Sequence, residues 1–287
     1  MILYPELGNI GRLGNQLFQL AASIALAKKN YTDVRLPKDI YSREIHGQIC
    51  LLNNFKLNIE LNTISDFNEF HRFLDNTSDI DTISKINDFK AAPDNTLLFG
   101  HFESEQFFLE YKNEICKQYK LNDDIEEFSI NYLKDLKLQV GNKEIVAIHF
   151  RLGDAFVIYD NISWFVEFIY EVIDKYFNED NYHFLVFTGG TREIDNGSDL
   201  NYIKKLFTDK TKFSFCDINN TINELAIMKN SEHLIINWRS TFSWWAGYLN
   251  TNPLKKIVVP RLIPFNDNSL FNPDFFWSKE FIQYNKA

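Results

Sequence analysis

The chain has 287 residues, is 45% hydrophobic and 24% charged, and carries a formal net charge of −9. Its length and composition are those of a folded protein with one large or two ordinary domains, and its negative charge argues against nucleic acid as the main partner. The three cysteines, Cys50, Cys116 and Cys216, are odd in number and widely spaced, which excludes a disulfide framework or zinc pattern and favours a reducing compartment.

The first half of the chain predicts a glycine-rich turn, a helix and then further strands and helices. Gly8, Gly11 and Gly14 recur every three residues, which is not the spacing of a dinucleotide-binding loop. Residues 15–29 have the periodicity of a helix, and a strand at 33–36 stops at the following proline. Residues 65–92 are polar with helical stretches, 96–102 predict a strand, and 107–135 are largely helical. Asp79 and Asp81 resemble a metal-binding DxD sequence, but their polar surroundings favour a solvated surface.

The second half alternates strands and helices. We predict a domain boundary near residues 137–143, and residues 221–224 have the spacing of a helix capping box. The alternation predicts a parallel sheet. Its expected elements are strands at 145–151, 182–188, 233–237 and 256–260 and helices at 164–176, 200–207 and 241–249, with a further helix start at the capping box.

The strand at 145–151 ends at Arg151, which Leu152, Gly153 and Asp154 follow. Ligands of open α/β sheets bind outside the carboxyl ends of the strands, and a guanidinium matches phosphate oxygens in bidentate fashion. The sequence therefore predicts that Arg151 binds a diphosphate. A surface turn with a local Arg–Asp pair explains this motif alone equally well, and His149 is a core residue or a ligand contact.

A second candidate anion site begins the helix at 241–249. Ser240 or Thr241 is the expected N-cap, and the remaining backbone amides and the helix dipole favour an anion. Of the adjacent Trp244 and Trp245, at least one is expected in the core. A buried strand–loop–helix without a ligand is the alternative that this segment alone favours.

Four segments, in this order, resemble those of glycosyltransferase family 11, the bacterial α-1,2-fucosyltransferases. They are GRLGNQLFQLA at 11–21, GHFESEQFF at 100–108, HFRLGD at 149–154 and STFSWW at 240–245. The resemblance implies an α/β fold of the GT-B type, with two Rossmann-like halves facing a cleft. Residues 1–138 would form the acceptor side, and residues 139–287 would bind the sugar nucleotide.

The resemblance also implies an inverting, metal-independent transfer of L-fucose from GDP-fucose to a galactoside hydroxyl of a cell-surface glycan, in α-1,2 linkage. GDP-fucose would be a co-substrate, with no other cofactor and no metal site. Arg151 and Asp154 are the predicted catalytic residues: Arg151 stabilises charge on the leaving diphosphate, and Asp154 is a candidate base. An aspartate in this position more often buttresses the arginine or the turn, so Glu103 and Glu105 are alternative bases.

The remaining site residues are assigned by half. The donor contacts would be His149, Arg151, Gly153, Arg239, Ser240, Thr241, Phe242 and Ser243; those of the cleft and acceptor side would be Arg12, Gly14, Asn15, Gln16, Glu103 and Glu105.

The sequence departs from the family pattern in the donor half. Leu152 replaces the second arginine before Gly-Asp, Arg239 stands where asparagine is usual, and residues 187–192 contain two glycines instead of a serine and acidic residues. Three hypotheses follow: a fucosyltransferase, a transferase that uses another nucleotide sugar, and a silent carbohydrate- or nucleotide-binding relative.

The location expected from the sequence is cytoplasmic. No apolar run reaches the roughly 18 residues that span a bilayer, and the first residues lack the basic region of a signal peptide. Association with the inner face of the membrane is left open, and the partners expected are a nucleotide sugar and an oligosaccharide acceptor.

Overall fold

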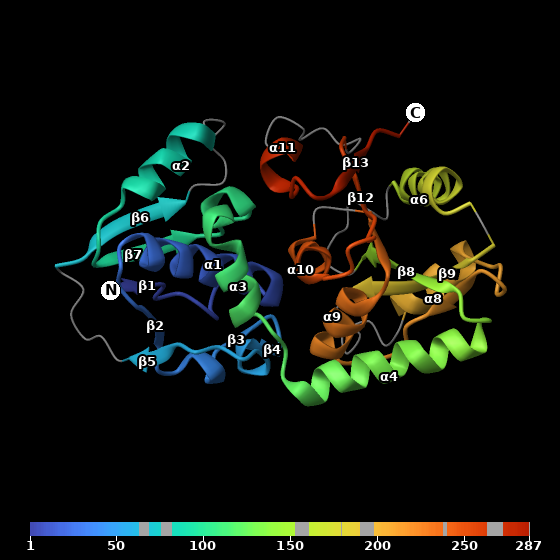
Figure 1. The fold of residues 1–287 in the computed structure, drawn as a ribbon, viewed down its shortest axis with the longest axis horizontal. Coiled ribbons are helices and arrows are strands. Elements are labelled where there is room, and N and C mark those ends of the chain that lie inside the picture. The colour runs from blue at the N-terminus through green and yellow to red at the C-terminus, as the bar shows by residue number, and fades with distance from the viewer. Residues whose placement is uncertain are drawn as a thin grey trace. The chain divides into compact units, whose positions relative to one another are not determined.

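The computed structural model describes residues 1–62, 69–75, 82–152, 161–178, 180–189, 198–237, 240–262 and 272–286. The chain divides into two compact units, each built around its own sheet (Figure 1). Unit 1 consists of Met1–Asn122 and Asn266–Ser278, and unit 2 of Asp123–Phe265 and Lys279–Ala287. Neither unit is a single continuous stretch of chain.

Unit 1 contains a five-stranded sheet in the order β5-β2-β1-β7-β6, in which every pair is parallel. Its strands are β1 (Ile2–Leu3), β2 (Val34–Pro37), β5 (Glu60–Asn62), β6 (His71–Asp75) and β7 (Thr96–Gly100), and β3 (Glu44–Ile45) pairs with β4 (Gln48–Ile49) in a separate hairpin. Its α-helices are α1 (Leu13–Lys29), α2 (Thr82–Ala91), α3 (Lys112–Gln118) and α11 (Pro273–Phe276); its 3₁₀ turns are η1 (Ile40–Ser42), η2 (Leu52–Asn54), η3 (Glu105–Phe107) and η4 (Leu109–Tyr111).

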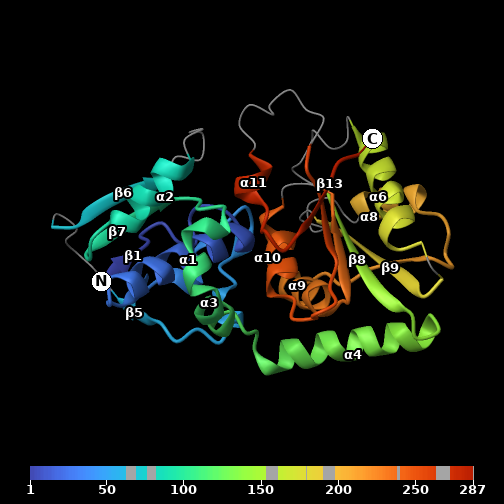
Figure 2. The same cartoon turned by 45° about the horizontal axis from the view of Figure 1, so that its top comes forward.

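Unit 2 contains a six-stranded parallel sheet in the order β10-β9-β8-β11-β12-β13. Figure 2 shows its two long strands, β8 and β9, side by side. The strands are β8 (Glu144–Arg151), β9 (Tyr182–Gly189), β10 (Phe213–Phe215), β11 (His233–Ile236), β12 (Ile257–Pro260) and β13 (Ile282–Tyr284). The helices are α4 (Asp123–Gln139), α6 (Ile162–Tyr176), α8 (Ser198–Leu206), α9 (Thr221–Asn230) and α10 (Thr241–Leu249).

Helices cover both faces of the unit 2 sheet. Successive side chains of β8 point to opposite faces, and each face packs against a different helix. Phe150 packs against Phe165 of α6, with ring centroids 6.5 Å apart, whereas His149 packs against Phe242 of α10 at 5.9 Å. The strand is a continuous apolar run that is buried on both faces, as is typical of a parallel sheet. Parallel pairing and the α/β class are therefore confirmed.

The division between the units differs from the predicted one. We predicted it between residues 138 and 139, at the end of α4, whereas the contacts divide the chain between Asn122 and Asp123, before this helix. The reason is that α4 packs against α9. Glu126 accepts hydrogen bonds from Lys229 (2.5 Å) and Asn230 (2.8 Å), and the apolar face of α4 is buried.

Two local predictions also change. Residues 71–75, within the segment expected to be polar with helical stretches, form the edge strand β6, which pairs with β7. Of its two apolar side chains, Phe73 enters the aromatic core and Leu74 is exposed. The α9 helix is capped by Asn220 rather than by a box that begins at Thr221. The Asn220 side chain accepts from the backbone N–H groups of Ile222 and Asn223, both at 3.1 Å.

Candidate functional site

In unit 2, the carboxyl ends of β8 and β11 and the first turn of α10 come together. The Arg151 backbone N–H donates to Oδ1 of Asn237 (3.0 Å), the residue that follows β11. The two strands are aligned so that His149 pairs with Ile236. Arg151, the last residue of β8, therefore lies at the edge of the sheet where ligands of open α/β sheets bind.

The N-terminus of α10 is capped by Ser240, one of the two caps predicted. Its hydroxyl accepts from the Ser243 backbone N–H (3.4 Å), while Thr241 and Ser243 are buried and Phe242 is half-buried. The first amides of the helix and its dipole favour an anion. Trp244 and Trp245 are both fully buried, so neither indole is a ligand platform.

His149 connects β8 to this helix end. Its Nδ1 lies 2.9 Å from the Ser243 hydroxyl, and burial together with the nearby Arg151 charge lowers its pKa to about 3. The imidazole is therefore neutral at ordinary pH and accepts from, or donates to, Ser243 without adding charge. His149 is buried, and its contact with Ser243 links β8 to the first turn of α10.

In unit 1, three polar side chains meet at the carboxyl end of β7 and the first turn of α1. Asn15 Nδ2 lies 3.0 Å from Glu103 Oε1 and 3.0 Å from His101 Nδ1. All three residues are half-buried. A carboxylate only accepts hydrogen bonds, so the amide nitrogen of Asn15 must face Glu103, and its second hydrogen then points at His101. We call these residues the Asn15–His101–Glu103 cluster.

The other residues predicted for unit 1 have structural partners. Gln16 is buried and donates to the Gly11 carbonyl oxygen (3.0 Å), Gly14 is buried in α1, and Arg12 is the extended residue before that helix. Glu105 is buried, and its Oε2 accepts from the Ser278 hydroxyl (2.9 Å). Of the two predicted glutamates, Glu103 is thus the more accessible.

Some predicted residues lie outside the described ranges: Gly153, Asp154 and Arg239 in the donor half, and Asp79 and Asp81 in the DxD sequence. Leu152, where the family has a second arginine, is fully buried. Within the described parts of the chain, no group of three or more His, Cys, Asp or Glu side chains is placed to hold a metal ion. Over those same parts, no helix is both long and apolar enough to cross a membrane.

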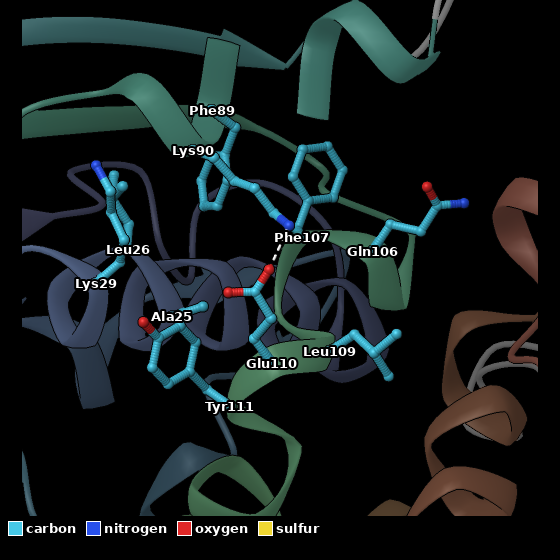
Figure 3. A pocket seen from close by; sticks show the side chains of 10 residues that line it. All are labelled: Ala25, Leu26, Lys29, Phe89, Lys90, Gln106, Phe107, Leu109, Glu110 and Tyr111. Atoms are coloured by element: carbon cyan, nitrogen blue, oxygen red, sulfur yellow. Dashed lines mark hydrogen bonds and ion pairs between the residues drawn. The ribbon is translucent and has the colours of Figure 1, made fainter. Parts of the chain in front are cut away.

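Two hollows lie away from these residues. The one between α1, α2 and the turns η3 and η4 encloses about 20 Å³, which is space for about one water molecule, beside the Lys90–Glu110 ion pair (2.5 Å; Figure 3). A larger hollow of about 350 Å³ in unit 2 is lined by Lys143, before β8, and Tyr182, at the start of β9. It therefore lies at the amino ends of these strands and contains none of the predicted site residues.

Sequence reasoning missed two residues. His101 lies in the segment at 100–108 that resembles the family. It is two residues from Glu103 at the end of a predicted strand, and side chains two apart on a strand point to the same side, which is the signal that both could reach one partner. Asn237 ends a predicted strand in the same way, but only the register of β11 against β8 shows that it holds the Arg151 backbone.

The two parallel α/β units define a GT-B-like fold, and solved structures share it. The chain is similar to POFUT1 in complex with GDP, with 13% identity over 90% of this chain and 97% of that one and a TM-score of 0.54. It is also similar to POFUT1 in complex with GDP-fucose (12% identity, 89% and 96% covered, TM-score 0.53) and to the fucosyltransferase NodZ from Bradyrhizobium (12% identity, 85% and 91% covered, TM-score 0.50).

The family follows from the sequence itself. The model of glycosyl transferase family 11 matches residues 6–272, and the chain belongs to this family. No curated protein sequence matches the chain significantly. The predicted family and GT-B-like fold are thereby confirmed, and the class of enzyme is a glycosyltransferase.

Proposed function

We propose that the protein transfers L-fucose from GDP-fucose to a galactoside hydroxyl of an oligosaccharide, in α-1,2 linkage and with inversion at the anomeric carbon. The observation that carries this proposal is the convergence of Arg151 with the N-terminus of α10 in a member of family 11. POFUT1 and NodZ, which share the fold, are described as bound to GDP or GDP-fucose, which supports guanosine diphosphate as the leaving group.

The proposed reaction places charge where unit 2 can stabilise it. As the bond from the anomeric carbon to the diphosphate breaks, the leaving group gains negative charge and the sugar gains oxocarbenium character. Arg151 and the backbone amides of Ser240, Thr241 and Phe242 would stabilise that negative charge, with Gly153 and Arg239 as further proposed donor contacts. His149 and Ser243 would hold the helix end, and unit 1 would supply the acceptor contacts, among them Arg12 and Asn15.

The first experiment is a thermal-shift titration of the purified protein with GDP, UDP, ADP and CMP, without added metal. We expect a shift with GDP that exceeds the others, followed by fucose transfer from GDP-fucose to lactose. A selective shift with UDP would overturn the fucosyl assignment and favour another nucleotide sugar. No shift with any nucleotide would favour a silent relative.

The linkage needs its own measurement, because NodZ is described as an α-1,6-fucosyltransferase. NMR of the product from lactose distinguishes a fucose on the galactose 2-hydroxyl from one on a 6-hydroxyl. The first product is expected. The second would contradict the α-1,2 assignment while leaving fucosyl transfer intact.

A further inference from the structure

The segment that follows β7 is held in a strained conformation. Gly100 has φ +116°, and the buried Phe102 has φ +56°, a left-handed value that is rare for a residue with a bulky side chain. For a residue other than glycine, such as Phe102, this backbone costs about 1–3 kcal/mol and persists only where the surroundings impose it. Residues 100–103 therefore adopt a conformation that the rest of unit 1 enforces.

The partners that enforce it are all buried. The Tyr4 hydroxyl hydrogen-bonds with both the N–H and the C=O of Gly100, and Asp75 accepts from the Phe102 backbone N–H at 2.7 Å. The Phe102 ring packs against Phe73, stacked with centroids 6.1 Å apart, and edge-on against Phe107 at 5.1 Å. Asp75 itself pairs with Lys85 (3.3 Å), so its charge is compensated.

This conformation directs His101 and Glu103, two residues apart, to the same Asn15 amide. Gly11 provides the space on the other side, since a Cβ there would lie 2.5 Å from the Asn15 Cβ. The arrangement fixes one oxygen of Glu103 and makes Nδ1 of His101 a hydrogen-bond acceptor, which in the neutral ring places the proton on Nε2. A rigid carboxylate held in this way has the features of a preorganised proton acceptor.

The neighbouring carboxylates of unit 1 have other tasks. Asp75 is bound to the Phe102 N–H and to Lys85, and Glu105 is bound to Ser278. Both are buried, at 5% and 2% exposure. They maintain the segment, whereas the Glu103 side chain is half-buried and therefore partly open to solvent.

We infer that Glu103 is the base that takes the proton from the acceptor hydroxyl, and that Asn15 and His101 are positioning residues that hold it. The inference rests on the proposed glycosyl transfer. In that step the acceptor oxygen forms a bond to the anomeric carbon, the bond to the diphosphate breaks, and its electron pair leaves with GDP. The hydroxyl proton passes to the Glu103 carboxylate, which later releases it to water.

The test compares Glu103→Gln with Glu110→Gln, a matched change of an exposed glutamate in the same region of unit 1. Transfer from GDP-fucose to lactose and calorimetric GDP affinity are measured for both. Loss of a general base reduces kcat by about 10²- to 10⁴-fold, so this loss is expected for Glu103→Gln. Its GDP affinity should stay within about twofold of the wild-type value. Glu110→Gln should retain both. A Glu103→Gln variant that keeps kcat within about threefold would overturn the inference.

The positioning roles have a separate readout. Asn15→Asp places a second carboxylate beside Glu103, which disfavours its ionised form, so the acid limb of the kcat/KM profile should move to higher pH. His101→Asn, whose amide oxygen can replace Nδ1, should retain more activity than His101→Leu. Unchanged pH profiles and equal activities would contradict these roles. A wild type that neither binds GDP nor transfers fucose overturns the proposed function as well, whereas an active Glu103→Gln variant overturns this inference alone.

Discussion

The two units repeat one architecture but present different chemistry at the carboxyl ends of their strands. Unit 2 gathers positive character there, from Arg151 and the amide end of α10, beside a histidine that burial keeps neutral. Unit 1 gathers an acid, an amide and an imidazole at the corresponding edge. The first edge suits a leaving diphosphate, and the second suits a hydroxyl that must lose a proton.

The units also differ in how they hold these groups. The unit 2 edge follows from regular elements, namely strand register and an N-capped helix. The unit 1 edge depends on a strained turn that a buried tyrosine, a buried aspartate and an aromatic cluster maintain. An anion site can thus be built from repeating backbone geometry, whereas a single placed carboxylate requires specific side-chain packing.

Among the following predictions, the largest effect is expected from removing the positive charge at the unit 2 edge. Arg151→Ala should lower transfer by about 100-fold or more and weaken GDP binding, because the removed guanidinium contacts the diphosphate in the proposed reaction. Arg151→Lys should restore only part of the loss, because an ammonium keeps the positive charge but lacks the bidentate fork of a guanidinium. Kinetics and calorimetry of both variants are the measurements, with the exposed Arg72→Ala of unit 1 as the control. Wild-type GDP affinity in Arg151→Ala would contradict this assignment.

The next effect tests the strain in unit 1. Gly100→Ala should lower the free energy of unfolding by about 3 kcal/mol, because a Cβ would lie 2.3 Å from the Asp75 carbonyl oxygen in addition to the cost of φ +116°. Gly47→Ala, at φ +73° with no atom within 4 Å of the added Cβ, should cost only about 1 kcal/mol. Denaturant unfolding of the two variants measures the difference. Equal costs would mean that the close contact at Gly100 relaxes freely.

A smaller effect is expected at the helix cap of unit 2. Ser240→Ala should cost about 1 kcal/mol of stability and weaken GDP binding several-fold, because its hydroxyl holds the first turn of α10. Asn220→Ala removes the cap of α9 at a similar cost in stability, but GDP affinity should not change. If both variants bind GDP equally well, the first turn of α10 is not part of the anion site.

The last expected effect is a dependence of stability on pH. Because the pKa of His149 is about 3 in the folded protein and 6.5 in the reference state, the unfolded chain binds more protons between these values. This group therefore contributes stability above about pH 6.5 that is lost as the pH falls toward 3. His149→Gln should lose less melting temperature between pH 7 and pH 4.5 than the wild type. An equal loss in both proteins would show that this histidine is not the buried neutral group described.

The sequence predicted the regular parts of the fold because their signals are local. The apolar run of β8, the periodicity of α1 and the strand–helix alternation of unit 2 are each contained in a few neighbouring residues. β6 was missed because only one apolar side chain of this edge strand, that of Phe73, is buried, so its sequence shows little alternation of apolar and polar residues. The division of the chain could not be predicted, since it depends on the packing of α4 against α9.

The candidate site was predictable to a similar degree. Arg151 and Ser240 are found where the pattern of strand end and helix start placed them. The choice between Glu103 and Glu105 required the fold, because Ser278, which is bonded to Glu105, lies far along the chain. The convergence of His101 and Glu103 on Asn15 depends on the positive φ of Phe102, for which a phenylalanine gives no sequence signal.

The late segment of unit 1 has a consequence for synthesis and for protein engineering. Phe275 accepts a hydrogen bond from Ser104 (2.5 Å) and packs on Phe107, and Ser278 binds Glu105. The ribosome makes these residues only after all the strands of unit 2 except β13, so unit 1 cannot be complete when its own sheet has emerged. For the same reason, a chimera that exchanges only residues 1–122 would separate Glu105 from its partner. A functional exchange between family members should carry residues 272–278 with it.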